Sequence, residues 1–287
     1  MKTAAPKRIK LSDRINAFVA SEAPLRNLAG NWSKKAKVAM DEANSLSLER
    51  VGITLTRLPK KLDGLKIVQL SDIHHSPFTG LEHIERVVKV ANRLRPDLFV
   101  LTGDYVSHER EYIEPVAKAL GQLKSRYGTF ACLGNHDHWT DADAVTKHFR
   151  EQGINMLVNE GLRLEVRGTS FWLAGVDDYM VGKTDVAAAL HGSFPDEMKL
   201  LLAHNPLIFR DAARLGVDLT FSGHTHGGQI KLRDDEKRLW PSRRLKAGLH
   251  SRKDAQIYIT RGIGTVVVPM RYQCPPEISL LELSCGI

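Results

Sequence analysis

The chain has 287 residues, 43% of them hydrophobic and 26% charged, a composition typical of a soluble globular protein with one large α/β domain and a short extension. Its three cysteines are too few and too scattered to form a disulfide framework, and they favour a reduced, cytoplasmic setting. The net charge of +8 lies entirely in residues 1–61, where 13 Lys and Arg stand against 5 Asp and Glu, so the excess charge belongs to an arm.

Residues 1–46 are predicted to be a basic amphipathic extension, and residues 47–287 the main domain. Apolar residues recur at helical spacing in residues 11–19 and again in residues 25–32, with three lysines close behind. This pattern predicts two short helices and neither a signal peptide nor a membrane span. The helices either pack on the main domain or bind an anionic membrane through residues 1–45. Nucleic acid is disfavoured as a partner because the arm lacks interleaved aromatic residues.

The first part of the main domain alternates strands and helices. After a strand that begins near Leu48, the apolar pattern predicts buried strands over residues 65–70, 98–101 and 129–133, and helices over residues 81–94, 113–124 and 141–152. Short loops between alternating strands and helices indicate a parallel sheet with right-handed crossovers.

The second part is rich in strands, which predicts a second sheet. The expected strands cover residues 155–158, 162–166, 170–174, 199–203 and 218–222, and later ones at residues 256–260, 265–268 and 278–283 are expected to complete the same sheet. The polar segment from Lys231 to Lys253 is predicted to be a loop.

Histidine and carboxylate residues cluster directly after five of these predicted strands. The clusters are Asp72-Ile73-His74, Gly103-Asp104, Gly134-Asn135-His136-Asp137, His204-Asn205 and Gly223-His224-Thr225-His226. Ligands of parallel sheets collect beyond the carboxyl ends of the strands, so these side chains are expected to meet there. Carboxylate and amide oxygens with neutral imidazoles suit divalent Mn, Fe, Co or Zn, and the absence of cysteine among them argues against a zinc finger.

Two metals that share a bridging carboxylate are a common arrangement for hydrolysis at phosphorus. Asp104, which follows a glycine at a strand end, is the natural bridge. Asp72, His74 and one of the late histidines are then expected on one side, and Asn135, His204 and the other late histidine on the other side. Taken singly, each residue has a simpler explanation, such as a helix cap, a turn or a surface histidine. Five clusters at five strand ends together favour the metal site.

These ordered motifs resemble the five-block signature of the calcineurin-like metallophosphoesterases, over a region from about Lys66 to the C-terminus. The resemblance implies a four-layer α/β/β/α sandwich with two mixed β-sheets flanked by helices and a metal site at the strand C-terminal ends. It also implies that His226 joins Asp72 and His74, that His224 joins Asn135 and His204, and that Asp104 bridges two transition metals. These are Mn, Fe, Zn or Co, divalent or of mixed valence, with Mn favoured.

By the same resemblance, a hydroxide that bridges the metals attacks phosphorus, His136 is the general acid, and Asp137 orients the His136 imidazole. The segments Gly223–Gln229 and Arg261–Thr265 resemble a bacterial branch of phosphodiesterases that includes a UDP-2,3-diacylglucosamine pyrophosphatase. The expected substrate is therefore a phosphodiester or pyrophosphate, including a nucleotide-diphosphate-linked lipid, at the inner face of the membrane. The alternatives are a non-catalytic metal-binding membrane adaptor and a protein Ser/Thr phosphatase.

Four further residues are candidates for substrate contact. His75 and His138 flank motif histidines, and Arg261 and Arg271 could clamp a second phosphate group through bidentate hydrogen bonds. For the histidines the alternative is a loop position without a ligand, and for the arginines it is an ion pair with Glu277 or Glu282.

Overall fold

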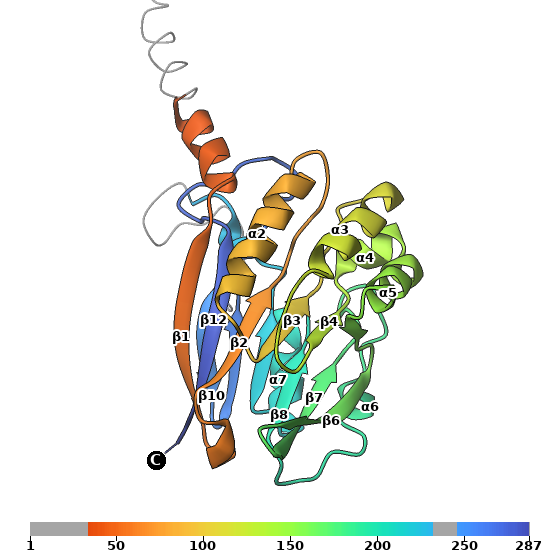
Figure 1. The fold of residues 1–287 in the computed structure, drawn as a ribbon, viewed down its shortest axis with the longest axis vertical. Helices are drawn as coiled ribbons and strands as arrows, with labels where there is room; N and C mark the ends of the chain where they lie inside the picture. The colour runs from red at the N-terminus through yellow and green to blue at the C-terminus, as the bar shows by residue number, and fades with distance from the viewer. Residues whose placement is uncertain (1–33, 232–245, 287) are drawn as a thin grey trace, which may run out of the picture.

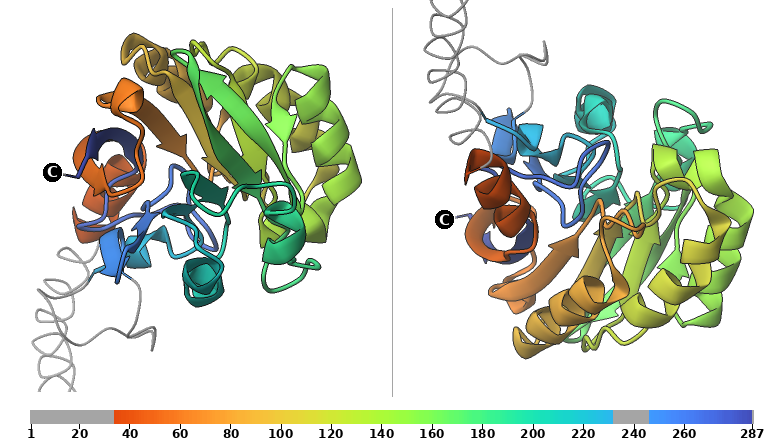
Figure 2. Two further views of the ribbon diagram at one scale, coloured as in Figure 1. Left: turned by 90° about the horizontal axis from the view of Figure 1, so that it is seen from below. Right: turned by 90° about the horizontal axis from the view of Figure 1, so that it is seen from above.

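Two six-stranded sheets form the centre of the molecule, which is known from a computed structural model that describes residues 34–231 and 246–286. The first sheet has the order β1-β12-β2-β3-β4-β5 and the second has the order β10-β11-β9-β8-β7-β6. Figure 1 shows both sheets with helices on their outer faces, and Figure 2 shows the same layers from two ends. The expected four-layer α/β/β/α sandwich is confirmed.

The first sheet is built around four parallel strands, which are β2 (Leu65–Leu70), β3 (Leu98–Thr102), β4 (Thr129–Cys132) and β5 (Asn155–Met156). Helices α2 (Leu81–Arg93), α3 (Ile113–Leu120) and α5 (Ala142–Glu151) lie between these strands in the chain. Along β3, Phe99 and Leu101 pack toward the helices, while Leu98 and Val100 pack toward the second sheet. Because successive side chains point to opposite faces, a strand buried on both faces is apolar throughout.

In the second sheet, β7 (Thr169–Gly175), β8 (Lys199–Leu202), β9 (Leu219–Ser222) and β11 (Ala255–Ile259) are parallel. The antiparallel strands β6 (Glu160–Val166) and β10 (Gly248–Arg252) form its edges. The short helices α6 (Val186–Ala189) and α7 (Phe209–Arg214) contribute to apolar clusters on its outer face. A core that includes Phe130, Phe171 and Phe221 joins the two sheets, so their carboxyl edges lie against each other.

Four expectations for the second part of the chain are wrong. The strand expected over residues 155–158 in the second sheet is β5, which covers Asn155–Met156 and pairs with β4 in the first sheet. Strand β12 (Glu277–Cys285) belongs to the first sheet, where it lies parallel to β1 (Ser47–Leu55) and antiparallel to β2. Residues 265–268 form a loop, because Val267 has a φ of 67°, which no strand can accommodate. Part of the predicted loop from Lys231 to Lys253 is strand β10, and residues 232–245 lie outside the described residues.

Residues 34–43 form a helix that lies near the N-terminal end of β12. The Ala39 carbonyl accepts the backbone N–H of Arg271, and the Glu42 carboxylate accepts the backbone N–H groups of Gln273 and Cys274. The two amphipathic helices predicted within residues 1–33 lie outside the described residues. Among residues 34–231 and 246–286, no helix combines the length and the apolar character that crossing a membrane requires.

Candidate metal centre

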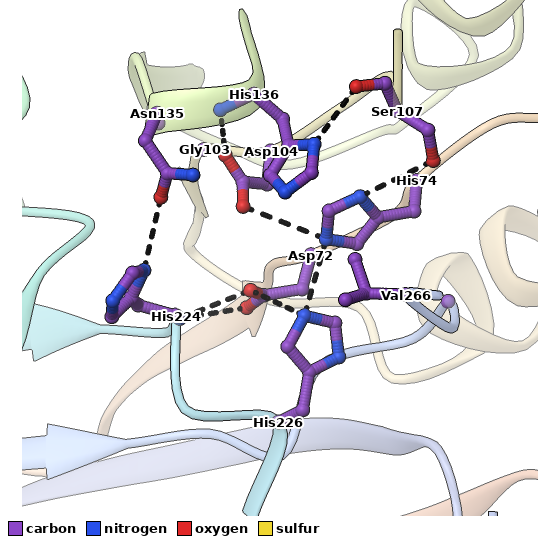
Figure 3. A network of polar contacts seen from close by, with 12 residues as sticks. Asp72, His74, Gly103, Asp104, Ser107, Asn135, His136, His224, His226 and Val266 are labelled. Atoms are coloured by element: carbon purple, nitrogen blue, oxygen red, sulfur yellow. Dashed lines mark hydrogen bonds and ion pairs between the residues drawn. The ribbon is translucent and has the colours of Figure 1, made fainter. Parts of the chain in front are cut away.

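The predicted ligand residues lie at the carboxyl ends of strands from both sheets, as expected. Asp72 and His74 follow β2, Asp104 follows β3, and Asn135 opens the short helix α4 (Asn135–Thr140) after β4. From the second sheet, His204 follows β8, and His224 and His226 follow β9. Figure 3 shows the labelled side chains pointing into one shared space, although they come from strands far apart in the sequence.

The backbone at these strand ends is strained. Five of the seven predicted ligands have φ between 48° and 68°, namely Asp72, His74, Asp104, His224 and His226. A residue other than glycine with positive φ is uncommon, and each costs roughly 1–3 kcal/mol unless the surrounding structure compensates. These five residues all lie at the strand ends that carry the predicted ligands. The strain therefore indicates that side-chain orientation at this point is functional.

Two groups of donor atoms share Asp104. In the first, His226 Nε2 lies 3.3 Å from Asp72 Oδ1 and 3.1 Å from His74 Nε2. In the second, His224 Nδ1 lies 3.0 Å from Asn135 Oδ1 and 3.2 Å from His204 Nε2. Oxygen Oδ2 of Asp104 lies between the groups, 3.1 Å from His204 Nε2 and 3.5 Å from His74 Nε2.

These distances fit two metal ions. Donor atoms bound to one ion at about 2.0–2.2 Å stand about 3.0–3.5 Å apart in a tetrahedral or octahedral shell. His204 Nδ1 lies 2.7 Å from the Thr102 carbonyl and donates to it, so the Nε2 lone pair of the neutral ring faces the Asp104 carboxylate. Two lone pairs at 3.1 Å repel each other unless a cation or a proton lies between them. The donor set thus requires a positive charge at this position.

The pKa values of the histidines also indicate a positive charge beside Asp104. Burial lowers the pKa of His74, His224 and His226, so their rings are neutral and have a lone pair for a metal. Burial has the same effect on His204, but the Asp104 carboxylate outweighs it and raises the pKa of His204 to about 10. Without a metal, a proton on His204 takes the place of the missing cation.

His136 lies beside the two groups and is held by two hydrogen bonds. Its Nδ1 lies 2.8 Å from the Ser107 carbonyl, and its backbone N–H donates to Asp104 Oδ1 at 2.8 Å. The centroid of its ring lies 4.7 Å from that of His74 and 4.7 Å from that of Trp139. Because Nδ1 donates to the carbonyl, Nε2 is the ring nitrogen of His136 that this hydrogen bond leaves free.

The expectation that Asp137 orients the His136 imidazole is wrong. The fully buried Asp137 carboxylate accepts the backbone N–H groups of Asp104, Tyr105 and Gly134, each at 2.8 Å. Asp137 is the third residue of α4, and from this position it reaches back to Gly134 and across to the loop after β3. Its carboxylate therefore fastens together the two loops that carry Asp104 and Asn135. The group that orients His136 is the Ser107 carbonyl, which residue type alone does not reveal.

The four candidates for substrate contact all have protein partners. His75 Nδ1 lies 2.9 Å from the Thr79 carbonyl, and His138 Nε2 lies 2.5 Å from Asp177 Oδ1. Arg261 forms ion pairs with Glu49 at 2.6 Å and with Glu277 at 3.1 Å.

Arg271 is enclosed, and its expected contact with substrate is wrong. The side chain has no exposed surface and donates to the carbonyls of Gly264, Cys274 and Arg261. Its Nη2 lies 3.5 Å from His226 Nδ1, so it supports the ring of His226 from behind.

Comparison with known proteins agrees with this geometry. The family model "Calcineurin-like phosphoesterase" matches residues 65–228. A Bos taurus protein named "Transmembrane protein with metallophosphoesterase domain" is 34% identical over 86% of this chain, which spans 59% of that protein's length. Bacillus subtilis YkuE, named an uncharacterized metallophosphoesterase, is 32% identical over 79% of this chain and 81% of its own length. Escherichia coli phosphodiesterase YaeI is 32% identical over 76% of this chain and 82% of its own length. The chain therefore belongs to the calcineurin-like phosphoesterase family.

Proposed function

We propose that the protein is a two-metal-dependent phosphohydrolase that cleaves a phosphodiester or pyrophosphate bond. Asp72, His74 and His226 would hold one metal, Asn135, His204 and His224 would hold the other, and Asp104 would be a ligand of both. The observation that carries the proposal is the convergence of the Nε2 atoms of His204 and His74 on the buried Asp104 carboxylate, at 3.1 and 3.5 Å. Manganese is the favoured metal, and iron, zinc and cobalt suit the same donors.

The metals, when bound, polarise the phosphoryl group and lower the pKa of a bound water toward ~7. His136 supplies the proton that the leaving oxygen needs. The Ser107 carbonyl holds the proton on Nδ1, so the imidazolium form carries its transferable proton on Nε2. The hydrogen bond from the backbone of His136 to Asp104 Oδ1 keeps this proton donor at a constant distance from the bridging residue.

The substrate is a phosphodiester, or a pyrophosphate within a nucleotide-linked lipid such as UDP-2,3-diacylglucosamine. The relative YaeI is named a phosphodiesterase, which supports the first class. The second class follows from the resemblance of the Gly223–Gln229 and Arg261–Thr265 segments to the lipid-processing branch.

Hydrolysis of bis-p-nitrophenyl phosphate by metal-reconstituted protein tests the proposal. Turnover is expected with manganese, and Asp104→Asn should lower both bound metal and rate. His136→Asn should keep both metals and lose roughly 10²- to 10⁴-fold in rate, the usual contribution of a general acid. Folded protein that binds two equivalents of metal but hydrolyses neither this ester, nucleotide-linked lipids nor phosphopeptides would support the adaptor. Activity on phosphopeptides alone would support the protein phosphatase.

Residues 1–46 are a separate extension in this proposal, and residues 47–287 are the catalytic domain. The extension contacts the anionic inner face of the membrane from the cytoplasm, with its lysines next to lipid headgroups. A contact of this kind weakens as salt is added, because exposed charges are screened beyond about 10 Å at 0.1 M ionic strength. Vesicle binding that does not change between low and high salt would contradict it.

A further inference from the structure

Exposed apolar side chains gather at the edge of the molecule that carries the metal centre. Among residues 34–231 and 246–286, fourteen large hydrophobic side chains are exposed. Eight of them stand on the segments that directly follow β2, β4, β7, β8, β9 and β11, and two more stand on the helical residues 34–43. The segments at the opposite edge, which precede β8 and β9, carry only Phe194 and Leu215. We call six of the eight the apolar rim: Phe78, Trp139, Tyr179, Met180, Leu207 and Val267.

Several contacts tie the rim to the metal centre. The Trp139 ring packs against His136, and the contact of 2.5 Å between His138 and Asp177 joins α4 to the segment that carries Tyr179 and Met180. Figure 3 shows Val266, the neighbour of Val267, beside the rings of His74 and His226. The parts of the rim at Trp139, at Tyr179 and Met180, and at Val267 therefore lie on segments that adjoin the metal centre.

Val267 is the most exposed residue of the rim and lies on a strained loop. Val267 is 88% exposed and has a φ of 67°, a conformation that β-branched residues rarely adopt. The side chain of Gln229 accepts from the backbone N–H of Val266 and donates to the carbonyls of Val266 and Val268. The Gln229 hydrogen bonds therefore keep an apolar side chain in water at the cost of strain, which favours a contact surface at this position.

Positive charge lies at the same edge. Lys34, Lys35 and Lys37 are exposed on the helix whose Ala39 carbonyl accepts from the backbone of Arg271. The Arg271 side chain in turn lies 3.5 Å from His226, so the helix stands close to the metal centre. Apolar tips beside lysines are the combination that enters the interface of an anionic bilayer.

We propose that the apolar rim docks on an anionic membrane surface, with the metal centre facing the bilayer. Five separate segments contribute to the rim, those that follow β2, β4, β7, β8 and β11, so its apolar side chains are scattered. A bilayer accepts such tips without matching their shape, whereas a protein partner requires a complementary packed surface. This inference goes beyond the proposed contact of residues 1–45, because it assigns the membrane contact to the catalytic domain itself.

Co-sedimentation of the full chain with vesicles tests the docking surface. The vesicles consist of equal parts phosphatidylcholine and phosphatidylglycerol, with pure phosphatidylcholine for comparison. The key pair is Leu207→Asp, at 60% exposure on the rim, and Leu215→Asp, at 47% exposure on the opposite edge. Both variants change the net charge equally and keep residues 1–45. Leu207→Asp, and likewise Phe78→Asp, should bind about tenfold more weakly than wild type, the loss expected for one partly buried apolar side chain.

Leu215→Asp should bind like the wild-type protein, and all variants should unfold at the wild-type temperature because the changed side chains are exposed. A wild-type protein that stays in solution with anionic vesicles would overturn the proposal. Equal vesicle binding by Leu207→Asp and wild type would also overturn it, because the extension alone would then make the contact. Equal weakening of binding by Leu207→Asp and Leu215→Asp would overturn it as well, because net charge alone would then explain the binding. The assay measures no hydrolysis, so its result is independent of the proposed phosphohydrolase activity.

Discussion

Gly134 stands where the chain after β4 passes the bridging carboxylate, and Gly134→Ala should disable the metal centre. A Cβ added at this position would lie 2.2 Å from Asp104 Oδ1 and 2.5 Å from the Asp104 backbone nitrogen. Cβ atoms essentially never approach other heavy atoms within 3.0 Å. The loop after β3, or helix α4, must therefore move by about 1 Å to admit the methyl group.

A shift of this size exceeds what a metal centre tolerates. Ligand distances vary by only about 0.2 Å, so Asp104 Oδ2 would leave the position it shares between the two donor groups. A displacement of about 1 Å in a catalytic arrangement costs about 100-fold in rate, and overpacking costs a further 1–3 kcal/mol, roughly, of stability. We expect Gly134→Ala to bind less than two equivalents of manganese and to hydrolyse bis-p-nitrophenyl phosphate at least about 100-fold more slowly.

The matched control is Gly80→Ala, because a Cβ there meets nothing within 4 Å and the glycine does not have positive φ. Metal content by elemental analysis after reconstitution, the rate of ester hydrolysis, and thermal unfolding are measured for both variants. Gly80→Ala should match the wild-type protein in metal content and rate, and it should unfold only slightly below the wild-type temperature, because alanine is a poorer N-cap of α2 than glycine. If Gly134→Ala retains both metals and the wild-type rate, the position that we assign to Asp104 as the bridge is refuted.

Asp137→Ala should lower the free energy of unfolding by about 3 kcal/mol or more, because three buried N–H groups lose their acceptor at about 1–3 kcal/mol each. Thermal unfolding at the wild-type temperature would show that Asp137 does not fasten these loops. Burial and the nearby Arg86 lower the pKa of His83 to about 4, below the value of about 6.5 in the unfolded chain. The unfolded state therefore binds more protons between these values, and stability should fall by up to about 3 kcal/mol as pH drops from 6.5 to 4. Urea unfolding of His83→Gln should show a smaller fall in the free energy of unfolding between pH 6.5 and 4. If the variant and the wild-type protein lose the same free energy over this range, His83 does not cause the loss.

Local pattern was sufficient for the parallel strands β2, β3 and β4 and for the donor residues that follow them. Strands β2 and β3 are short apolar runs followed by polar clusters, so both their burial and the placement of Asp72 and Asp104 could be predicted. The same reasoning failed at β12, because an apolar strand does not indicate which of two sheets it joins. Its pairing with β1 and β2 is decided by contacts over more than two hundred residues of sequence.

The loop after β11 shows a second kind of failure. Three consecutive valines favour a strand, but Gln229, more than thirty residues earlier, binds their backbone through its side-chain amide. Hydrogen bonds of this kind hold Val267 at positive φ and turn the segment outward. The local preference of the valines is thus overridden by a partner that is distant in sequence.

Sequence alone determined which donor atoms are available and in what order they follow the strands, since both depend on residue type and on short-range pattern. Tertiary structure decided which side chains point into the proposed metal centre and which ones support them. Asp137 binds backbone N–H groups, Ser107 orients His136 through a carbonyl, and Arg271 is enclosed behind His226. The packing of the two sheets also placed the six side chains of the apolar rim at the edge that carries the metal centre. These features arise from contacts between segments that are distant in the sequence. Many of the contacts are made by backbone groups, and because every residue has these groups, residue type does not reveal them.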